Sequence, residues 1–273
     1  DNNIRSILED SDGNLWVGTR AGVVRRSPGG TFMGFPDEHI LAGKNVGAVY
    51  QDVEGSLWVG TRATGLTQLR DGAFTTYGRA EGLSDDVILS LHGDDAGTLW
   101  IGTWGKGLNR YKDGAFESFG NQDGVSSKSI LSFEIGRDGS LWFGTNGNGL
   151  YRYAGGVFET FRKTDGLTSN LIFALHEDAE GVLWIGTFGG GLNRYVDGKF
   201  DSFGADDGLP DTHIQAMTSA EDGGVWIGTY SGGLAHLRDG KFTTYGEKQG
   251  LSDEDVAALY RDADGNLWVG TSG

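Results

Sequence analysis

Short apolar segments alternate with glycine-rich turns along the whole chain, and this alternation repeats at a fixed interval. Every repeat contains Leu-Trp-Val-Gly-Thr or a close variant, first at residues 15–19 and last at residues 267–271. The tryptophans of these segments are spaced 42 residues apart, at Trp16, Trp58, Trp100, Trp142, Trp184, Trp226 and Trp268. Such a period indicates an array of stacked supersecondary units. Since no insertion interrupts the register, we expect residues 1–273 to form a single domain.

One period holds four short strand patterns, which we call A, B, C and D. Within residues 85–124 the predicted strands are 87–92, 99–103, 108–111 and 116–119. The Asp113-Gly114 dipeptide between the last two is a strong hairpin signal. No segment has a sustained 3.6-residue apolar period, and glycine recurs too often for helical repeats. Four antiparallel strands per period predict an all-β fold, a β-propeller of four-stranded antiparallel blades.

The array ends on a half repeat. The chain starts with a strand A at residues 4–9 and stops after a strand B at residues 267–271, which makes seven A–B hairpins but six C–D hairpins. We expect seven blades with an incomplete last blade, because that arrangement buries both Trp16 and Trp268. The alternative is six blades plus an extra hairpin. An unpaired edge on the last blade would allow self-association.

Positions that are alike in every repeat are expected to serve the scaffold. The tryptophans would form a packing layer between sheets, the glycine after strand B suits a bulge or a close backbone approach, and the following threonine would satisfy a backbone group. Small residues fill one strand-A position, which fits crowding near a propeller axis: Ser6, Ala48, Ser90, Ser132, Ala174, Ala216 and Ala258. The strand-C arginines at 110, 152 and 194 suggest pairing between blades with acidic residues.

One position breaks the uniformity. The residue directly after Gly-Thr differs from repeat to repeat: Arg20, Arg62, Trp104, Asn146, Phe188, Tyr230 and Ser272. In a propeller, the B–C and D–A connections share one end of the blades, and the D–A connections add Lys128, Asn170 and His213 there. Aromatic faces stack on sugar faces, while arginine and asparagine bind hydroxyls or carboxylates. Of these ten residues, the nine other than Ser272 are our candidate ligand-binding residues. Tolerant loop positions would vary in the same way, so that alternative stays open.

Composition excludes several classes of function. With 38 acidic and 22 basic residues the formal net charge is −16, so nucleic acid is not an expected partner. No apolar run is long enough for a membrane span, and the chain begins at Asp1 without Met, as a processed or excised piece would. The absence of cysteine excludes disulfides and thiolate zinc sites.

Neither a metal nor a cofactor is indicated. The Asp-x-Asp-Gly turns at residues 10–13 and 262–265 are similar to the opening of a calcium loop, but the other repeats break the pattern and turn chemistry explains it. His92 and His176 share one strand-A position without a third ligand, which favours paired-strand or channel-lining histidines. No nucleophile elbow, phosphate-binding loop or zinc-protease motif is present. We therefore expect no catalytic residues and no enzyme.

The repeat resembles a known family. Residues 183–195 (Leu-Trp-Ile-Gly-Thr-Phe-Gly-Gly-Gly-Leu-Asn-Arg-Tyr), with Asp-Gly-Lys-Phe-Asp-Ser-Phe at 197–203 and Asp-Gly-Leu at 207–209, are similar to the two-component regulator propeller repeat. This resemblance implies a seven-bladed ring from the periplasmic sensor region of a bacterial hybrid histidine kinase. It also implies a periplasmic or extracellular location and sensing that often concerns carbohydrates. The first C–D unit departs from the family, with Val23-Val24-Arg25-Arg26-Ser27-Pro28 in place of Gly-Leu-Asn-Arg-Tyr.

Three hypotheses follow. The first is a non-enzymatic sensor propeller that binds a carbohydrate or a small polar ligand at the B–C/D–A end. The second is a structural or protein-interaction propeller, natural or engineered, without a small-molecule ligand. The third is an enzyme similar to the streptogramin lyases, although their catalytic histidine pair has no evident counterpart among the five histidines, at positions 39, 92, 176, 213 and 236.

Overall fold

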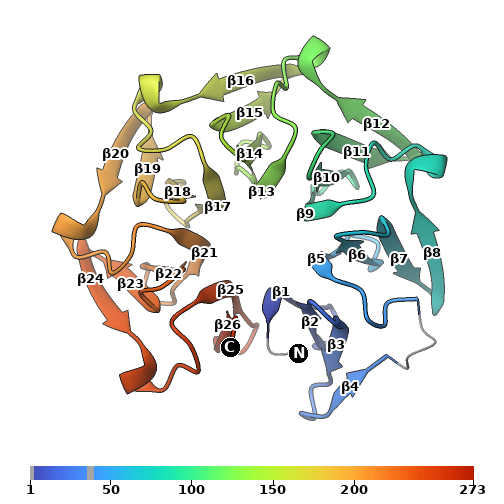
Figure 1. Cartoon of the computed structure of the whole chain (residues 1–273), viewed down its shortest axis with the longest axis horizontal. Helices are drawn as coiled ribbons and strands as arrows, with labels where there is room; N and C mark the ends of the chain where they lie inside the picture. Colours follow the sequence, from blue (N-terminus) through green and yellow to red (C-terminus); the bar gives the residue numbers. More distant parts are fainter. Residues whose placement is uncertain (1–2, 36–39) are drawn as a thin grey trace. The chain divides into compact units, whose positions relative to one another are not determined.

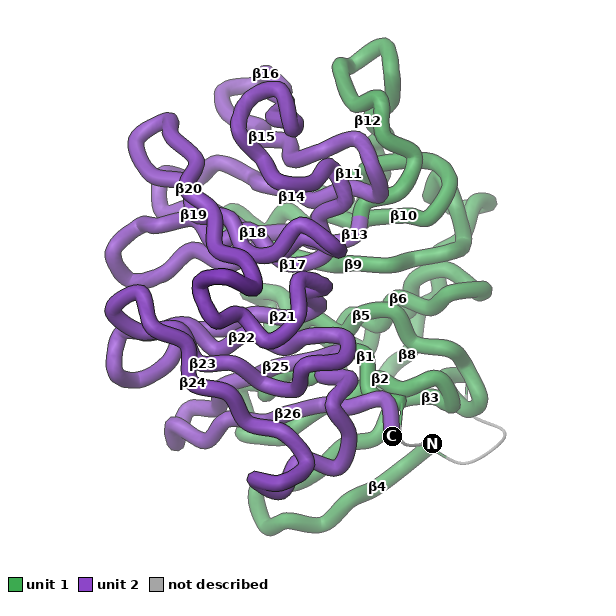
Figure 2. Tube along the Cα trace, turned by 60° about the vertical axis from the view of Figure 1, so that its left-hand side comes forward, with its two compact units in different colours: residues 1–130 green, residues 131–273 purple. Residues whose placement is uncertain are grey.

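The computed structural model of the chain describes residues 3–35 and 40–273, and in these ranges the regular elements are strands and five three-residue 3₁₀ helices. Contacts divide the chain into two compact units, residues 1–130 and residues 131–273 (Figure 2). Six sheets have four antiparallel strands in chain order and one sheet has two (Figure 1). The chain is therefore an all-β propeller built from four-stranded antiparallel blades. His39, one of the histidines considered above, lies outside the described residues.

Unit 1 contains three of the four-stranded sheets. Their strands are β1 (Ile4–Glu9), β2 (Leu15–Thr19), β3 (Gly22–Arg26) and β4 (Phe32–Gly34); β5 (Val46–Gln51), β6 (Leu57–Thr61), β7 (Leu66–Arg70) and β8 (Ala73–Tyr77); and β9 (Ile88–Gly93), β10 (Leu99–Thr103), β11 (Leu108–Lys112) and β12 (Ala115–Phe119). The 3₁₀ helices η1 (Arg79–Glu81) and η2 (Asn121–Asp123) follow β8 and β12.

Unit 2 contains the other sheets, and its first strand, β13, begins at the last residue of unit 1. The strands are β13 (Ile130–Ile135), β14 (Leu141–Thr145), β15 (Leu150–Ala154) and β16 (Val157–Phe161); β17 (Ile172–Glu177), β18 (Leu183–Thr187), β19 (Leu192–Val196) and β20 (Lys199–Phe203); β21 (Ile214–Ser219), β22 (Val225–Thr229), β23 (Leu234–Arg238) and β24 (Lys241–Tyr245); and β25 (Val256–Arg261) with β26 (Leu267–Thr271) alone. The helices η3 (Lys163–Asp165), η4 (Ala205–Asp207) and η5 (Glu247–Gln249) precede the later sheets.

The strands predicted for the third repeat are confirmed to within one residue at each end. The Asp113-Gly114 hairpin is also present, with positive φ at both residues, as its turn type requires. The 3₁₀ helices were not predicted. Three residues are too few to show a hydrophobic period, so this element leaves no pattern in the sequence.

Neighbouring sheets approach each other closely at the glycine of strand B. A Cβ atom on Gly186 would lie 2.5 Å from Cγ2 of Ile214 in the next sheet, and one on Gly60 would lie 2.5 Å from Cγ2 of Ile88. The predicted close backbone approach is thus confirmed. The bulge lies in strand A instead, for example at residue 173, between the pairs Ile172–Thr187 and Ala174–Gly186.

The same contact explains the small residues of strand A. Ala174 lies directly opposite Gly186, and a Cβ atom on that glycine would be 3.2 Å from the Cβ of Ala174. In unit 1, Ser6 lies opposite Gly18 in the same way. A larger side chain at this position would fill the space that the branched side chain of the next sheet needs.

The repeated tryptophans pack between sheets, as predicted. Trp58 is 1% exposed, and its ring centroid lies 5.3 Å from that of Tyr111 in the next sheet. The indole N–H of Trp58 donates to Asp52 Oδ2 at 2.7 Å, while Oδ1 of Asp52 accepts two backbone N–H groups of the A–B turn. Asp10, Asp178 and Asp262 hold their tryptophans in the same way. This is the turn chemistry that we expected of the first aspartate in these turns.

The expected pairing of strand-C arginines between blades is wrong. Arg152 Nη2 lies 2.6 Å from Asp138 Oδ2, and Arg194 Nη2 lies 2.5 Å from Asp201 Oδ2, in each case within one sheet or its A–B turn. Arg110 likewise pairs with Glu117, which lies opposite it on the adjacent strand. The register places arginine, tryptophan and carboxylate side by side on one face, so the carboxylate of the same sheet is the nearest partner.

Replacing Gly186 by Ala should lower the free energy of unfolding by about 1–3 kcal/mol, because the new methyl group collides with Ile214. Chemical denaturation measures the effect. Gly204→Ala is the matched control, since a Cβ atom at Gly204 would meet nothing within 4 Å. The cost should also shrink when Ile214→Ala is added in a double-mutant cycle. Equal stabilities of Gly186→Ala and the wild type would contradict the packing argument.

Candidate functional site

The backbone of each B–C connection is held by one side chain, that of the threonine that ends strand B. Thr187 Oγ1 donates to the carbonyl of Gly191 at 2.7 Å and accepts the N–H of Gly190 at 3.1 Å. Thr61, Thr103, Thr145 and Thr229 form the same bond to the glycine four residues on, and Thr19 bonds to the carbonyl of Gly22. The prediction that this threonine satisfies a backbone group is confirmed. The residue that follows it therefore starts from a defined backbone position.

That variable residue is also tied to the D–A connection that leads into its own sheet. The backbone N–H of Phe188 donates to the carbonyl of Leu171, and the N–H of Tyr230 donates to the carbonyl of His213 at 2.9 Å. In unit 1 the N–H of Arg62 donates to the carbonyl of Asn45 at 2.8 Å. The backbone is thus satisfied in the same way in these repeats, and the side chains are left to differ.

In unit 2 these positions gather four rings, which we call the aromatic cluster: Phe173, Phe188, His213 and Tyr230. The Phe188 ring stacks on Phe173 at a centroid distance of 4.9 Å, meets His213 edge-on at 4.5 Å and Tyr230 at 5.9 Å. Tyr230 is 52% exposed, whereas Phe188 and His213 are partly buried. In this cluster Phe188 and His213 are thus held by their neighbours, and Tyr230 is accessible to solvent.

Asp211 orients the histidine of the cluster. Its Oδ1 accepts from His213 Nδ1 at 2.8 Å and from the His213 backbone N–H at 3.0 Å. Its Oδ2 accepts the N–H and the hydroxyl of Ser231, the residue after Tyr230. Burial alone would raise the pKa of Asp211, but these hydrogen bonds lower it below its usual value. Asp211 thus fixes both His213 and the loop that carries Tyr230.

The two asparagines among our candidates have different environments. Asn146 is exposed and forms an isolated bridge with Leu171. The side-chain oxygen of Asn170 accepts the backbone N–H of Lys163 at 2.9 Å, so it caps η3. Asn170 therefore has a structural role already, and only its amide NH₂ remains available to a ligand.

In unit 1 the variable positions hold cations and one indole. Arg20, Trp104 and Lys128 are exposed, Trp104 by 50%, and Arg62 is partly buried. Burial, together with the positive charges of Arg5 and Arg20, lowers the pKa of Arg62 to about 10. The charges of Arg5 and Arg20 thus act on the guanidinium group of Arg62.

Sequence reasoning missed Phe173 and Arg5, which occupy the strand-A bulge of their repeats. A signal was present, because this position varies within an otherwise uniform strand: Arg5, Gly47, Leu89, Leu131, Phe173, Gln215 and Ala257. It also missed Asp211, whose role depends on contacts with two different connections.

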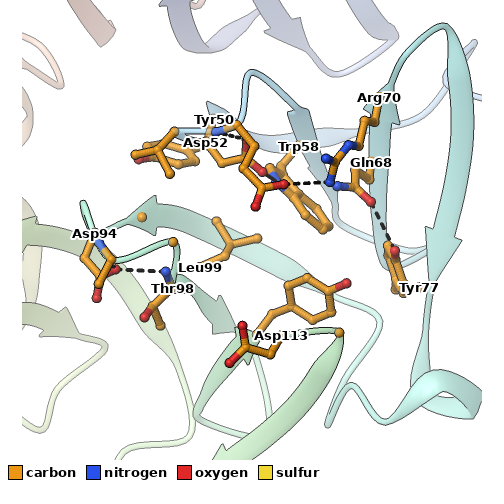
Figure 3. Close-up of a pocket in the computed structure, with 17 residues that line it drawn as sticks. Tyr50, Asp52, Trp58, Gln68, Arg70, Tyr77, Asp94, Thr98, Leu99 and Asp113 are labelled. Atoms are coloured by element: carbon orange, nitrogen blue, oxygen red, sulfur yellow. Dashed lines mark hydrogen bonds and ion pairs between the residues drawn. The ribbon is translucent and has the colours of Figure 1, made fainter.

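A cavity of about 390 Å³ lies at the other end of unit 1, where the A–B and C–D turns meet (Figure 3). Trp58, Tyr77 and Tyr111 contribute to its wall, and burial with a hydrogen bond to Tyr77 raises the pKa of Tyr111 to about 12. Arg70 and Glu54 form an ion pair of 2.6 Å at this site.

A second hollow with equivalent lining residues shows that this cavity belongs to the repeated scaffold. In unit 2 a space of about 410 Å³ is lined by Trp142, Tyr195 and Asp197, the repeat equivalents of Trp58, Tyr111 and Asp113. A feature that recurs with the scaffold residues reflects the spacing of adjacent sheets. None of the nine candidate residues lines either hollow.

The remaining histidines and acidic groups do not assemble a metal site in the part of the chain that the structure describes. Within residues 3–35 and 40–273, no three His, Cys, Asp or Glu side chains are placed to hold a metal ion. His92 lies against Tyr50, and burial lowers its pKa to about 4; His176 Nε2 lies 2.6 Å from Ser219 Oγ. No helix in these ranges is long and apolar enough to cross a membrane.

Comparison with known families gives one match, to the family described as two component regulator propeller. It covers seven segments, which are residues 1–21, 40–63, 82–105, 124–147, 166–189, 208–231 and 250–273. No curated protein sequence matches the chain.

Among solved structures, the chain is similar to the extracellular domain of a protein described as hybrid two component system BT3049 from B. thetaiotaomicron. The TM-score is 0.86 at 22% identity, and the match covers 100% of this chain and 39% of that one. It is similar to a streptogramin B lyase, with a TM-score of 0.82, 18% identity, and coverage of 100% and 91%. It is also similar to the extracellular domain of one component system BT4673 from B. thetaiotaomicron, with a TM-score of 0.80, 20% identity, and coverage of 99% and 37%. The chain thus spans well under half of the two system proteins. At these identities the likeness shows the fold.

Removing the Asp211 carboxylate should loosen the connection that carries Tyr230. In Asp211→Ala, we expect amide hydrogen exchange at Ser231 and His213 to accelerate by about tenfold or more, because both N–H groups lose their acceptor. The Gly105 amide, which bonds to Asp85 in the same way, is the internal control. The loss of stability should shrink as the pH falls below about 3.8, since protonation removes the same interactions in the wild type. Unchanged exchange at Ser231 would contradict this role of Asp211.

Proposed function

The chain belongs to the two-component regulator propeller family, and from this premise we propose that it is a non-enzymatic ligand-binding propeller of a bacterial sensor. Its ligand is a carbohydrate or a small polar molecule held at the B–C/D–A end of the blades. The observation that carries the proposal is the aromatic cluster, whose exposed Tyr230 stands beside supported rings at positions where the scaffold imposes no common residue.

The chemistry of the cluster suits a sugar. The C–H faces of a pyranose stack on aromatic rings, and a half-exposed tyrosine offers both a ring face and a hydroxyl. His213 adds a polar edge whose orientation Asp211 determines. Asn146 and the free amide of Asn170 supply further donors within unit 2. In unit 1 we assign ligand contacts to Arg20, Arg62, Trp104 and Lys128.

The cellular location is part of the same proposal. Two of the solved structures to which the chain is similar are described as extracellular domains. We therefore place this chain in the periplasm or outside the cell, where it would report on a ligand that does not enter the cytoplasm.

A streptogramin-lyase-like activity is the second candidate, because that enzyme shares the fold over nearly its whole length. Such chemistry needs a group that moves a proton near the bound substrate. In the aromatic cluster that group would be His213, oriented by Asp211. Ring opening of a cyclic depsipeptide by the wild type, lost in His213→Ala, would establish the lyase and overturn the non-enzymatic proposal.

We further infer that β25 and β26 are strands A and B of a seventh blade. Val256 packs against Gly228 of the preceding sheet, where a Cβ atom would lie 2.7 Å from the valine side chain, as in the other sheets of unit 2. Trp268 keeps its bond to Asp262 at 2.8 Å. These contacts support a seventh blade over a redundant hairpin. Since this sheet has two strands, β26 forms its edge and offers backbone groups to a second chain.

Ligand binding predicts a specific pattern of thermal shifts. A library of oligosaccharides should contain members that raise the Tm of the wild type, and Tyr230→Ala or Trp104→Ala should reduce that rise without unfolding the protein, because both side chains are half exposed. Phe32→Ala is the matched control, since Phe32 is also exposed but lies on β4. A library that leaves the Tm unchanged would favour the scaffold hypothesis over the sensor.

The free edge predicts concentration-dependent self-association. Native mass spectrometry should detect dimers whose share rises with protein concentration and falls in Val269→Lys, because a charged side chain on an edge strand opposes pairing. Val157→Lys is the control, since Val157 is an exposed valine on β16. A monomer at every concentration would contradict self-association through β26.

A further inference from the structure

Three arginines lie together at the B–C/D–A end of unit 1, and we call them the arginine cluster: Arg5, Arg20 and Arg62. Arg5 occupies the bulge of β1, between the pairs Ile4–Thr19 and Ser6–Gly18. Arg20 directly follows β2, and Arg62 directly follows β6 of the next sheet. The cluster is therefore built from two adjacent sheets of one unit.

The aromatic cluster shows how these positions converge. Phe173, Phe188 and Tyr230 occupy the positions of Arg5, Arg20 and Arg62 four periods later in the chain. Arg5 and Phe173 occupy the same strand-A bulge, and Arg62 and Tyr230 have the same backbone tie to the D–A connection. Since the Phe188 ring lies 4.9 Å from Phe173 and 5.9 Å from Tyr230, side chains at these positions point toward one another. By this repeat equivalence we expect the three guanidinium groups to lie near one another, and the positive charges of Arg5 and Arg20 do act on Arg62.

The cluster is unusual for a chain with 38 acidic residues. The strand-C arginines each have a carboxylate partner within their own sheet. Arg20 and Arg62, by contrast, form no ion pair within residues 3–35 and 40–273. The Nε atom of Arg62 is buried without a hydrogen-bond acceptor. Arg20 and Arg62 are thus two like charges without an ion pair among these residues, and Arg62 is partly buried, so a packing role does not explain why these two are there.

We propose that the arginine cluster is an anion-binding subsite that takes an oxyanion group of the ligand, such as a carboxylate, sulfate or phosphate. A planar guanidinium offers two parallel N–H donors to such a group, and Arg62 Nε–H is an additional donor that has no acceptor in the protein. A bound oxyanion places a negative charge beside Arg20 and Arg62, which form no ion pair among the described residues. The inference rests on the proposed function, since it gives the ligand a negative charge.

The test measures the Tm in galacturonate, sulfate and phosphate, each against sodium chloride at equal ionic strength. At least one oxyanion should raise the Tm of the wild type in a saturable way, and Arg62→Gln should weaken that affinity by about tenfold or more. Without any oxyanion, Arg62→Gln should have a higher Tm than the wild type, because it removes a repelled, partly buried charge. The three anions distinguish a carboxylate ligand from a sulfated or phosphorylated one.

Arg70→Gln is the matched control, because Arg70 is an exposed arginine of the same unit that pairs with Glu54. It should keep the oxyanion response and should not raise the Tm. A lower ligand-free Tm of Arg62→Gln with an unchanged oxyanion response would overturn the subsite and make the cluster structural. The subsite would also be overturned if no oxyanion raised the Tm while a neutral oligosaccharide bound the wild type and Arg62→Gln but not Tyr230→Ala. The proposed function would stand in that case. An oxyanion response that Arg62→Gln removes supports the subsite even if no neutral sugar binds.

Discussion

The structure depends on one contact, in which a branched side chain at the start of one sheet rests on the strand-B glycine of the sheet before it. Ile214 on Gly186, Ile88 on Gly60 and Val46 on Gly18 are examples, and in each case a Cβ atom on the glycine would lie within 2.7 Å of the branched side chain. This spacing also explains why strand A carries alanine or serine opposite the glycine. Such a contact tolerates no variation, because an interior packed at this density cannot absorb an extra methyl group without strain.

This constraint leaves different side chains free to vary at the two ends of the blades. At the A–B/C–D end, the first aspartate of several turns binds the indole N–H and the turn backbone, so its oxygens are already occupied. At the B–C/D–A end, the threonine and the backbone ties satisfy the main chain by themselves. The scaffold therefore does not require a particular side chain at the position after the threonine. Two repeats can consequently have the same backbone and opposite chemistry, as the arginine cluster and the aromatic cluster do.

This division explains why the hollows at the A–B/C–D end are poor candidates for a specific site. Their walls contain the tryptophan and tyrosine that every repeat needs for packing, as with Trp58 and Tyr111 or Trp142 and Tyr195. A ligand that bound there would meet nearly the same surface in several places. A site with a single specificity needs residues that differ between repeats, and those lie at the other end.

The sequence by itself determined the period, the four strands of a repeat, and the tryptophan, glycine and threonine that hold them, because each of these needs is local and recurs every 42 residues. It also indicated Phe188, Tyr230, Arg20 and Arg62 as a variable set. Only the tertiary structure decided that Arg110 pairs with Glu117 of its own sheet, that Phe173 and Arg5 complete the clusters, and that Asp211 holds both His213 and Ser231. The physical reason is that register and bulges place side chains from different strands and different repeats next to one another. Spacing along a single chain does not contain that information.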